Sequence, residues 1–300
     1  MELELNKIYQ GDALSVLKEF PSDSVDCVVT SPPYYRLRNY QVEGQIGLEK
    51  TYTEYINNLC DIFNEIKRVL KKTGTVWVNL GDIYSGPKNG NMEIYKNKKV
   101  SENNSFRKRK QNIPIKSLMQ IPSRFAIEMT NRGWILRNKI IWHKPSCMPQ
   151  SVTDRLTVDF EEILFFVKSK KYYFDQESIK EPTVTRDNIV RDRDNSRLNN
   201  TPGRTRMNGL KTNNYKKRNK RCVWTITTKP FKDAHFAVYP PDLIETPIKA
   251  GCPDGGVVLD PFIGSGTTAL VARNLGKNYV GIELNKEYIK IIENRLGLKI

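Results

Sequence analysis

The stretch Thr30-Ser31-Pro32-Pro33-Tyr34 decides how the rest of the sequence is interpreted. It follows Val25-Asp26-Cys27-Val28-Val29, a short apolar run that predicts a buried strand. The two prolines end this strand, hold φ at about −65° and leave main-chain carbonyls without neighbouring N–H donors. Such carbonyls beside the ring of Tyr34 suit a planar group with an exocyclic amine. The pentapeptide alone is equally compatible with a proline-rich turn.

A second pattern lies near the end of the chain. Val257-Val258-Leu259-Asp260 is an apolar strand, and it leads into the turn Pro261-Phe262-Ile263-Gly264-Ser265-Gly266 and a helix expected over residues 267–275. Glycines let the backbone approach a ligand closely, and a helix N-terminus favours electron-rich groups. The next expected strand, residues 279–283, ends at Glu283, an acidic residue suited to ribose hydroxyls. The turn lacks the lysine of a phosphate-binding P-loop, which argues against a nucleoside triphosphate.

Together, and in this order, the two motifs resemble those of the circularly permuted β group of S-adenosylmethionine-dependent DNA amino-methyltransferases, the N4-cytosine/N6-adenine family. The resemblance covers residues 5–85, 120–175 and 223–296. It implies an α/β fold with a doubly wound, Rossmann-like methyltransferase sheet, mostly parallel with one antiparallel strand. It also implies a permuted motif order and an inserted target-recognition region.

The resemblance assigns roles to both motifs. Its implied catalytic residues are Ser31, Pro32, Pro33 and Tyr34: the serine hydroxyl and a main-chain carbonyl near Pro32 accept hydrogen bonds from the base amine, and the tyrosine stacks on the base. The implied S-adenosylmethionine-binding residues are Asp12, Asp260, Phe262, Gly264, Gly266, Thr267 and Glu283.

Two residues have a purely structural alternative. Asp12 follows Gly11 at the start of an expected helix, so its carboxylate also suits a helix cap. Trp142, in the expected strand over residues 134–142, either lines the base pocket or belongs to the apolar core. The expected strand over residues 160–167 should form a hairpin with it.

The implied activity is site-specific DNA methylation, with transfer of a methyl group to the N4 amine of a flipped-out cytosine. Ser31, rather than Asp, at the variable position of the motif favours cytosine-N4, and N6-adenine methylation is the alternative. Methylation of RNA or protein, or a non-catalytic DNA-binding module, fits the sequence less well. A restriction endonuclease partner and a homodimer are both left open.

The positive charge is concentrated in two segments. The chain carries a formal net charge of +16, and residues 86–118 hold nine Lys and Arg against two Asp and Glu. Residues 180–222 hold thirteen against four, so the remainder is close to neutral. This pattern favours a polyanionic partner, here double-stranded DNA. The candidate DNA contacts are Arg36, Arg38, Lys216, Lys217 and Arg218.

Composition excludes several other classes. No apolar run reaches the roughly 20 residues that span a bilayer, and no signal peptide is expected, which favours a cytoplasmic protein without membrane contact. Five cysteines occur without a C-x-x-C pair and only two histidines are present, so no metal site is expected. We expect a catalytic half over residues 1–175, which includes a basic loop at 85–118, a basic target-recognition insert at 176–222 and a cofactor-binding half at 223–300.

Overall fold

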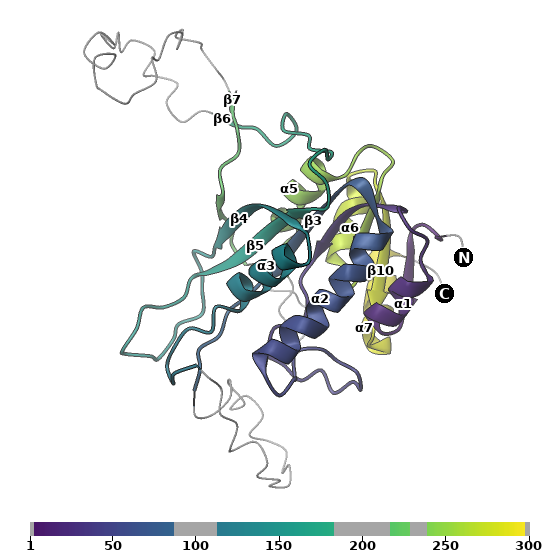
Figure 1. Ribbon diagram of the computed structural model, residues 1–300. Coiled ribbons are helices and arrows are strands. Elements are labelled where there is room, and N and C mark those ends of the chain that lie inside the picture. The colour runs from purple at the N-terminus through teal and green to yellow at the C-terminus, as the bar shows by residue number, and fades with distance from the viewer. Residues whose placement is uncertain (1–2, 87–112, 183–216, 229–238, 298–300) are drawn as a thin grey trace, which may run out of the picture. The chain divides into compact units, whose positions relative to one another are not determined.

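The structure is a computed structural model that describes residues 3–86, 113–182, 217–228 and 239–297 (Figure 1). The chain forms two compact units, one made of Met1–Asp175 with Cys222–Ile300 and the other of Gln176–Arg221. Most of the basic segments, and Lys216 with them, lie outside the described residues. The roles expected for residues 1–175, 176–222 and 223–300 therefore stay predictions.

The first unit is built on an eight-stranded sheet with the order β1-β10-β9-β2-β3-β5-β4-β8. All neighbouring pairs are parallel except β3 with β5 and β5 with β4, so among the described strands of this sheet β5 alone runs against the rest. The predicted sheet, mostly parallel with one antiparallel strand, is confirmed. The strands are β1 Lys7–Gln10, β2 Val25–Thr30, β3 Leu70–Leu80, β4 Ile135–His143, β5 Phe160–Val167, β8 Val223–Thr225, β9 Val257–Asp260 and β10 Asn278–Glu283.

The order of the strands explains how two motifs at opposite ends of the chain come together. The C-terminal strand β9 pairs with β2, with Leu259 opposite Val28, and β10 pairs with β1, with Val280 opposite Lys7. The C-terminal motif is thereby placed beside the N-terminal one, as a permuted motif order requires. By contrast, β8 pairs with β4 at the far edge, so residues 223–225 do not lie among the strands of the expected cofactor-binding half.

Helices cover both faces of this sheet. One face carries α1 (Ala13–Glu19), α2 (Tyr52–Val69) and α3 (Ile121–Asn131), whose buried side chains share one apolar cluster with the strands. Figure 1 shows α2 and α3 in front of the sheet and α5 and α6 behind it. The second layer consists of α5 (Pro241–Gly251), α6 (Thr267–Asn274) and α7 (Lys286–Leu296).

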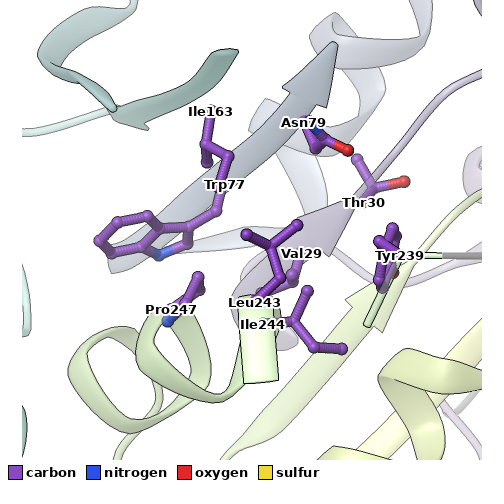
Figure 2. Close-up of a pocket in the computed structure, with 9 residues that line it drawn as sticks. All are labelled: Val29, Thr30, Trp77, Asn79, Ile163, Tyr239, Leu243, Ile244 and Pro247. Carbon is purple, nitrogen blue, oxygen red and sulfur yellow. The ribbon is translucent and has the colours of Figure 1, made fainter. Parts of the chain in front are cut away.

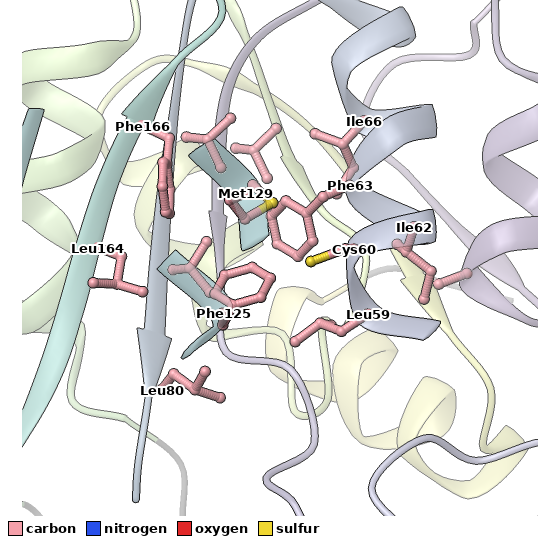
Figure 3. Close-up of a cluster of buried hydrophobic side chains, with 14 of the residues drawn as sticks. Leu59, Cys60, Ile62, Phe63, Ile66, Leu80, Phe125, Met129, Leu164 and Phe166 are labelled. Atoms are coloured by element: carbon pink, nitrogen blue, oxygen red, sulfur yellow. The ribbon is translucent and has the colours of Figure 1, made fainter. Parts of the chain in front are cut away.

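The main core forms where α2 faces α3 and the strands (Figure 3). Thr51 caps α2, since its side chain accepts a hydrogen bond of 3.1 Å from the Glu54 N–H. Phe63 of α2 meets Phe125 of α3 edge-on with 5.2 Å between ring centroids, and Phe125 in turn meets Phe166 of β5. Each fully buried Leu, Ile or Phe stabilises the fold by roughly 1.5–3 kcal/mol, so this cluster fixes α2 against the sheet.

The end of α2 differs from what the sequence predicts. Apolar residues keep helical spacing from Tyr55 to Leu70 and Gly74 predicts the end of the helix, but α2 ends at Val69 and β3 begins at Leu70. Leu70 already has extended angles and pairs with Val25 of β2. A Cβ on Gly74 would lie 2.5 Å from the Leu70 side chain and 3.0 Å from the Asp26 carbonyl. The glycine therefore serves close packing inside β3 and does not end the helix.

The second unit contains a short antiparallel pair. In it, β6 (Glu181–Pro182) pairs with β7 (Lys217–Arg218). No helix among the described residues is long and apolar enough to cross a membrane.

Candidate active site

Polar residues follow four parallel strands at one edge of the sheet. Because β1, β2, β9 and β10 run in the same direction, the residues after their carboxyl ends meet at this edge. They are Asp12 after β1, the Ser31–Tyr34 stretch after β2, Asp260 at the end of β9 and Glu283 at the end of β10. The structure thus brings the two sequence motifs to one place.

The main-chain carbonyls of the proline motif differ in whether they accept hydrogen bonds within the protein. The hydroxyl of Tyr55, buried in α2, donates a 2.9 Å hydrogen bond to the Pro33 carbonyl, and the Leu37 N–H donates to the Tyr34 carbonyl at 3.3 Å. Within the described residues the Pro32 carbonyl accepts no hydrogen bond. Pro32 itself is buried, and its carbonyl is an acceptor of this loop that the described residues leave without a hydrogen bond.

Tyr34 is held at its hydroxyl by side chains from two other strands. The hydroxyl lies 2.7 Å from Oε2 of Glu161 on β5 and 3.1 Å from Oδ1 of Asn79 on β3, and the Ser31 hydroxyl donates to it at 3.4 Å. Burial, and then the nearby Glu161 carboxylate, raise the pKa of Tyr34 well above its ordinary value, so the phenol is neutral. Its ring packs on Gly81, where a Cβ would lie 2.5 Å from the ring.

These partners of Tyr34 are not evident from the sequence. Asn79 closes an apolar strand, and Glu161 lies far away in sequence in a strand that also carries Glu162. Only the pairing of β3 with β5, which sets Asn79 opposite Ile163, brings them together.

Asp260 organises the glycine turn. Its buried carboxylate accepts hydrogen bonds from the Thr30 hydroxyl at 2.6 Å, the Thr268 hydroxyl at 2.5 Å, the Tyr239 hydroxyl at 3.0 Å and the Phe262 N–H at 3.1 Å. Burial raises its pKa from the ordinary value. Four protein donors bind this one carboxylate, so Asp260 holds the turn in shape, and the cofactor contact expected for it stays a prediction.

The two glycines of the turn have different surroundings. Both adopt left-handed angles, with φ of 54° at Gly264 and 80° at Gly266. A Cβ on Gly266 would meet the Ile292 side chain of α7 at 2.9 Å, so this glycine is needed for packing. A Cβ on Gly264 would meet nothing closer than 3.9 Å, and the space in front of it is open. Gly264 is therefore the position where a ligand can approach the backbone.

Glu283 is fixed by the turn it faces. One carboxylate oxygen accepts from the Gly264 N–H at 2.9 Å and the other from the Asn285 N–H at 2.8 Å. The residue is 9% exposed, and this desolvation raises its pKa to about 7, an effect that the two N–H donors oppose. A carboxylate at the strand end is chemically suited to accept hydrogen bonds from ribose hydroxyls.

Asp12 follows β1, the neighbour of β10 in the sheet, and its capping role is confirmed. Oδ1 of Asp12 accepts hydrogen bonds of 2.9 Å from the N–H and the hydroxyl of Ser15. The Gly11 N–H donates to the Glu283 carbonyl at 2.9 Å, which connects this loop to the carboxyl end of β10. Oδ2 of Asp12 makes no hydrogen bond within the described residues, so the cap and a ligand contact are compatible.

Thr267 faces the protein instead of the open side of the turn. Its hydroxyl accepts a 2.8 Å hydrogen bond from Nη1 of Arg295, which also donates to the Ser265 carbonyl at 3.0 Å. Arg295 belongs to α7, and burial lowers its pKa from the ordinary value. It is a partner of the turn that sequence spacing does not indicate.

A pocket lies between the carboxyl ends of β2 and β3 and helix α5. Its enclosed space is small, about 10 Å³, which is roughly the room that one water molecule needs. Figure 2 shows polar atoms of Thr30, Asn79 and Tyr239 at one end, and Trp77 with Pro247 at the other. Thr30 and Tyr239 both bind Asp260, so this pocket joins the proline motif to the glycine turn. Trp142 is not among its lining residues: it is buried and its ring N–H donates to the Ile226 carbonyl.

The expected DNA contacts that the structure describes belong to both units. Arg36 donates to the Lys50 carbonyl at 2.7 Å, which gives it a structural role in the loop before α2. Arg38 is half-buried in the same loop. In the second unit, Lys217 is exposed and Arg218 pairs with Glu181 at 3.2 Å. Among the described residues no cluster of three or more His, Cys, Asp or Glu is placed to hold a metal ion.

Comparison with known proteins agrees with this geometry. The fold and the two motifs at one sheet edge define a Rossmann-like methyltransferase with permuted motif order. A family model described as DNA methylase, the N6/N4 methyltransferase family, matches residues 25–294, and the chain belongs to this family.

Relatives match along almost the whole chain. The Type II methyltransferase M.Cfr9I of Citrobacter freundii is 42% identical over 296 residues, which cover 98% of this chain and 89% of the relative. The Type II methyltransferase M.SmaI of Serratia marcescens is 41% identical and the match covers 97% and 90%.

Solved structures share the fold at lower identity. The PvuII DNA methyltransferase, described as cytosine-N4-specific, aligns with a TM-score of 0.67 at 19% identity and covers 98% of this chain and 87% of that one. TTHA0409, a putative DNA modification methylase from Thermus thermophilus solved in complex with S-adenosyl-L-methionine, aligns with a TM-score of 0.59 at 23% identity over 97% of this chain and 94% of its own.

Proposed function

We propose that this DNA methylase transfers a methyl group from S-adenosylmethionine to the N4 amine of cytosine in double-stranded DNA. The observation that carries the proposal is the loop after β2. Its Pro32 carbonyl, to which no described residue donates, and its Ser31 hydroxyl lie at the same sheet edge as the glycine turn and Glu283. An amine acceptor and a cofactor cradle are thereby brought to one site.

In this mechanism the proline motif binds the amine. The nitrogen lone pair of a cytosine amine is delocalised into the ring, which makes it a poor nucleophile. If the Ser31 hydroxyl and the Pro32 carbonyl accept hydrogen bonds from the two N–H groups of this amine, they favour the pyramidal nitrogen of the transition state. The ring of Tyr34 stacks on the base, which helps to offset the few kcal/mol needed to flip the base out of the duplex.

The residues of the other motif fit the cofactor. Gly264 presents open backbone, Glu283 has a carboxylate at the end of β10, and Asp12 keeps one oxygen uncommitted. We assign Glu283 to the ribose, Asp12 to the adenine and the turn around Gly264 to the amino-acid end. Phe262, Gly266, Thr267 and Asp260 hold that turn in shape. When bound, S-adenosylmethionine supplies the electrophilic methyl group.

Cytosine is proposed over adenine for two reasons. Ser31 stands at the variable position of the motif, and the PvuII enzyme with the shared fold is described as cytosine-N4-specific. The test is incubation of DNA with labelled cofactor, followed by digestion to nucleosides that separates N4-methylcytosine from N6-methyladenine. Label in N6-methyladenine would replace cytosine with adenine as the target.

Two partners belong to the same proposal. The relatives are named Type II methyltransferases, and we propose that a restriction endonuclease with the same recognition sequence accompanies this enzyme. A homodimer is the second, and light scattering with and without a cognate duplex measures it directly.

A further inference from the structure

Side chains from two strands, β3 and β5, and from the loop after β2 meet at the hydroxyl of Tyr34. Glu161 of β5 takes the central place: Oε2 lies 2.7 Å from the Tyr34 hydroxyl and accepts from Nδ2 of Asn79 at 3.0 Å. Its other oxygen, Oε1, accepts from Nζ of Lys144, the residue that directly follows β4. One carboxylate thereby joins the loop after β2 to β3 and to the end of β4.

The side chains of Asn79, Glu161 and Lys144 are largely shielded from solvent. Asn79 is 5% exposed, and the side chains of Glu161 and Lys144 are 18% and 19% exposed. Nζ of Lys144 also lies 4.4 Å above the ring of the buried Trp142. A charge pair in such surroundings is costly to desolvate, and removal of one partner leaves the other uncompensated. The pair therefore has a defined geometry, unlike a surface ion pair.

The direction of the central hydrogen bond follows from protonation. The Tyr34 phenol is neutral, because burial and the neighbouring carboxylate raise its pKa. It has one proton to donate, and the carboxylate at 2.7 Å is closer than the Asn79 oxygen at 3.1 Å. A hydrogen bond to an ionised acceptor is about twice as strong as a neutral one, so Glu161 fixes where the hydroxyl points. Contact with Gly81 fixes one side of the ring.

We propose that Glu161, held by Lys144 and Asn79, is a positioning residue that sets the orientation of the Tyr34 ring for stacking on the flipped base. This inference rests on the proposed stacking role of Tyr34. The ring is oriented before the base arrives, so less side-chain freedom is lost on stacking. Glu161 acts only through Tyr34 and does not touch the reacting amine.

The test is a cycle of Tyr34→Phe, Glu161→Gln and the double variant, in single-turnover methylation with cofactor and duplex binding measured alongside. Tyr34→Phe keeps the ring and leaves the Glu161–Lys144 pair intact, so it does not depend on the folding of the glutamate variant. Misplacement of a reacting group by about 1 Å can cost 100-fold, and we expect each single variant to slow transfer about 10- to 100-fold. Because both act through one hydrogen bond, the double variant should be no slower than the slower single variant.

The matched control is Glu162→Gln. Glu162 is the next residue of β5, its side chain is 17% exposed, and it pairs with Lys139 at 2.9 Å on the opposite face of the sheet. It should keep the full transfer rate, while affinities for cofactor and duplex stay unchanged in all variants.

Four outcomes separate the two proposals. Full transfer by Tyr34→Phe, or losses that multiply in the double variant, would overturn the positioning role while cytosine methylation stands. Equal slowing by Glu162→Gln would overturn it as well, since the effect would then follow from any loss of charge in β5. Methylation of adenine by the unaltered enzyme would overturn only the proposed target base. The same set of variants would then be measured on adenine, so the positioning role would still be tested.

Discussion

Glu283 links cofactor binding to pH. Its pKa of about 7 means that the carboxylate is largely protonated at pH 6 and largely ionised at pH 8. Since the ionised form accepts stronger hydrogen bonds from hydroxyls, we predict that affinity for S-adenosylmethionine rises about tenfold across this interval. Calorimetric titration at both pH values measures it, and Glu283→Gln should lose most of this dependence. An identical pH profile in the two proteins would remove Glu283 from the ribose site.

The same residue makes the free protein less stable at higher pH. Its pKa is raised from 4.5 in the unfolded chain to about 7, so the folded state binds this proton more tightly. The contribution of Glu283 to the free energy of unfolding therefore falls as pH rises from 4.5 to about 7 and is constant above that. Urea unfolding at pH 5 and pH 7.5 measures the change, and Glu283→Gln should show a smaller decrease between the two than the unaltered protein.

At the scale of elements, the two glycines of the turn between β9 and α6 have different roles: Gly266 serves packing and Gly264 serves cofactor binding. Alanine at either Gly264 or Gly266 has to adopt a left-handed angle, which costs about 1 kcal/mol. Gly266→Ala also presses on Ile292, so it should lower the free energy of unfolding further than Gly264→Ala. Gly264→Ala should weaken cofactor binding more, because its methyl group enters the open space before the turn. Denaturant unfolding and calorimetry together test the pair, and the reverse ranking in either measurement would contradict the assignment.

The elements also show where sequence reasoning works. The strands before the proline motif and the glycine turn are predictable because apolar runs end at Pro32 and near Gly264, where local chemistry dictates a turn. The end of α2 is not predictable from the sequence, because Gly74 makes close contacts with Leu70 and Asp26 that exist only once β3 has joined the sheet. Glu161 escapes sequence reasoning for the same reason: its partners come from other strands.

At the scale of the whole molecule, positive charge is concentrated along the sequence in residues 86–118 and 180–222. Lys217 is exposed in the second unit, whereas Arg218 pairs with Glu181 there. We predict that replacement of Lys216, Lys217 and Arg218 by alanine weakens binding to all duplexes alike. It should also lower the slope of log K against log salt by up to about 0.9 for every phosphate that is no longer bound. Arg218 should contribute least, because its charge is already paired.

Sequence preference should survive this triple replacement, because phosphate contacts position a protein while base contacts specify the sequence. Fluorescence anisotropy on cognate and scrambled duplexes over a range of salt measures both quantities. An unchanged salt slope would mean that these charged side chains are only hydrated and do not bind phosphates. A loss of sequence preference with intact non-specific affinity would assign base recognition to these residues.

The central claim is that the loop from Ser31 to Tyr34 performs methyl transfer and does not merely connect β2 to α2. The most direct test is single-turnover transfer by the unaltered protein, Ser31→Ala and Tyr34→Ala, with the product identified as a nucleoside and duplex affinity measured in parallel. We predict N4-methylcytosine as the product, transfer slowed at least about tenfold by each variant, and duplex affinity nearly unchanged. Full turnover by Tyr34→Ala, or a loss of rate matched by an equal loss of duplex affinity, would contradict the claim.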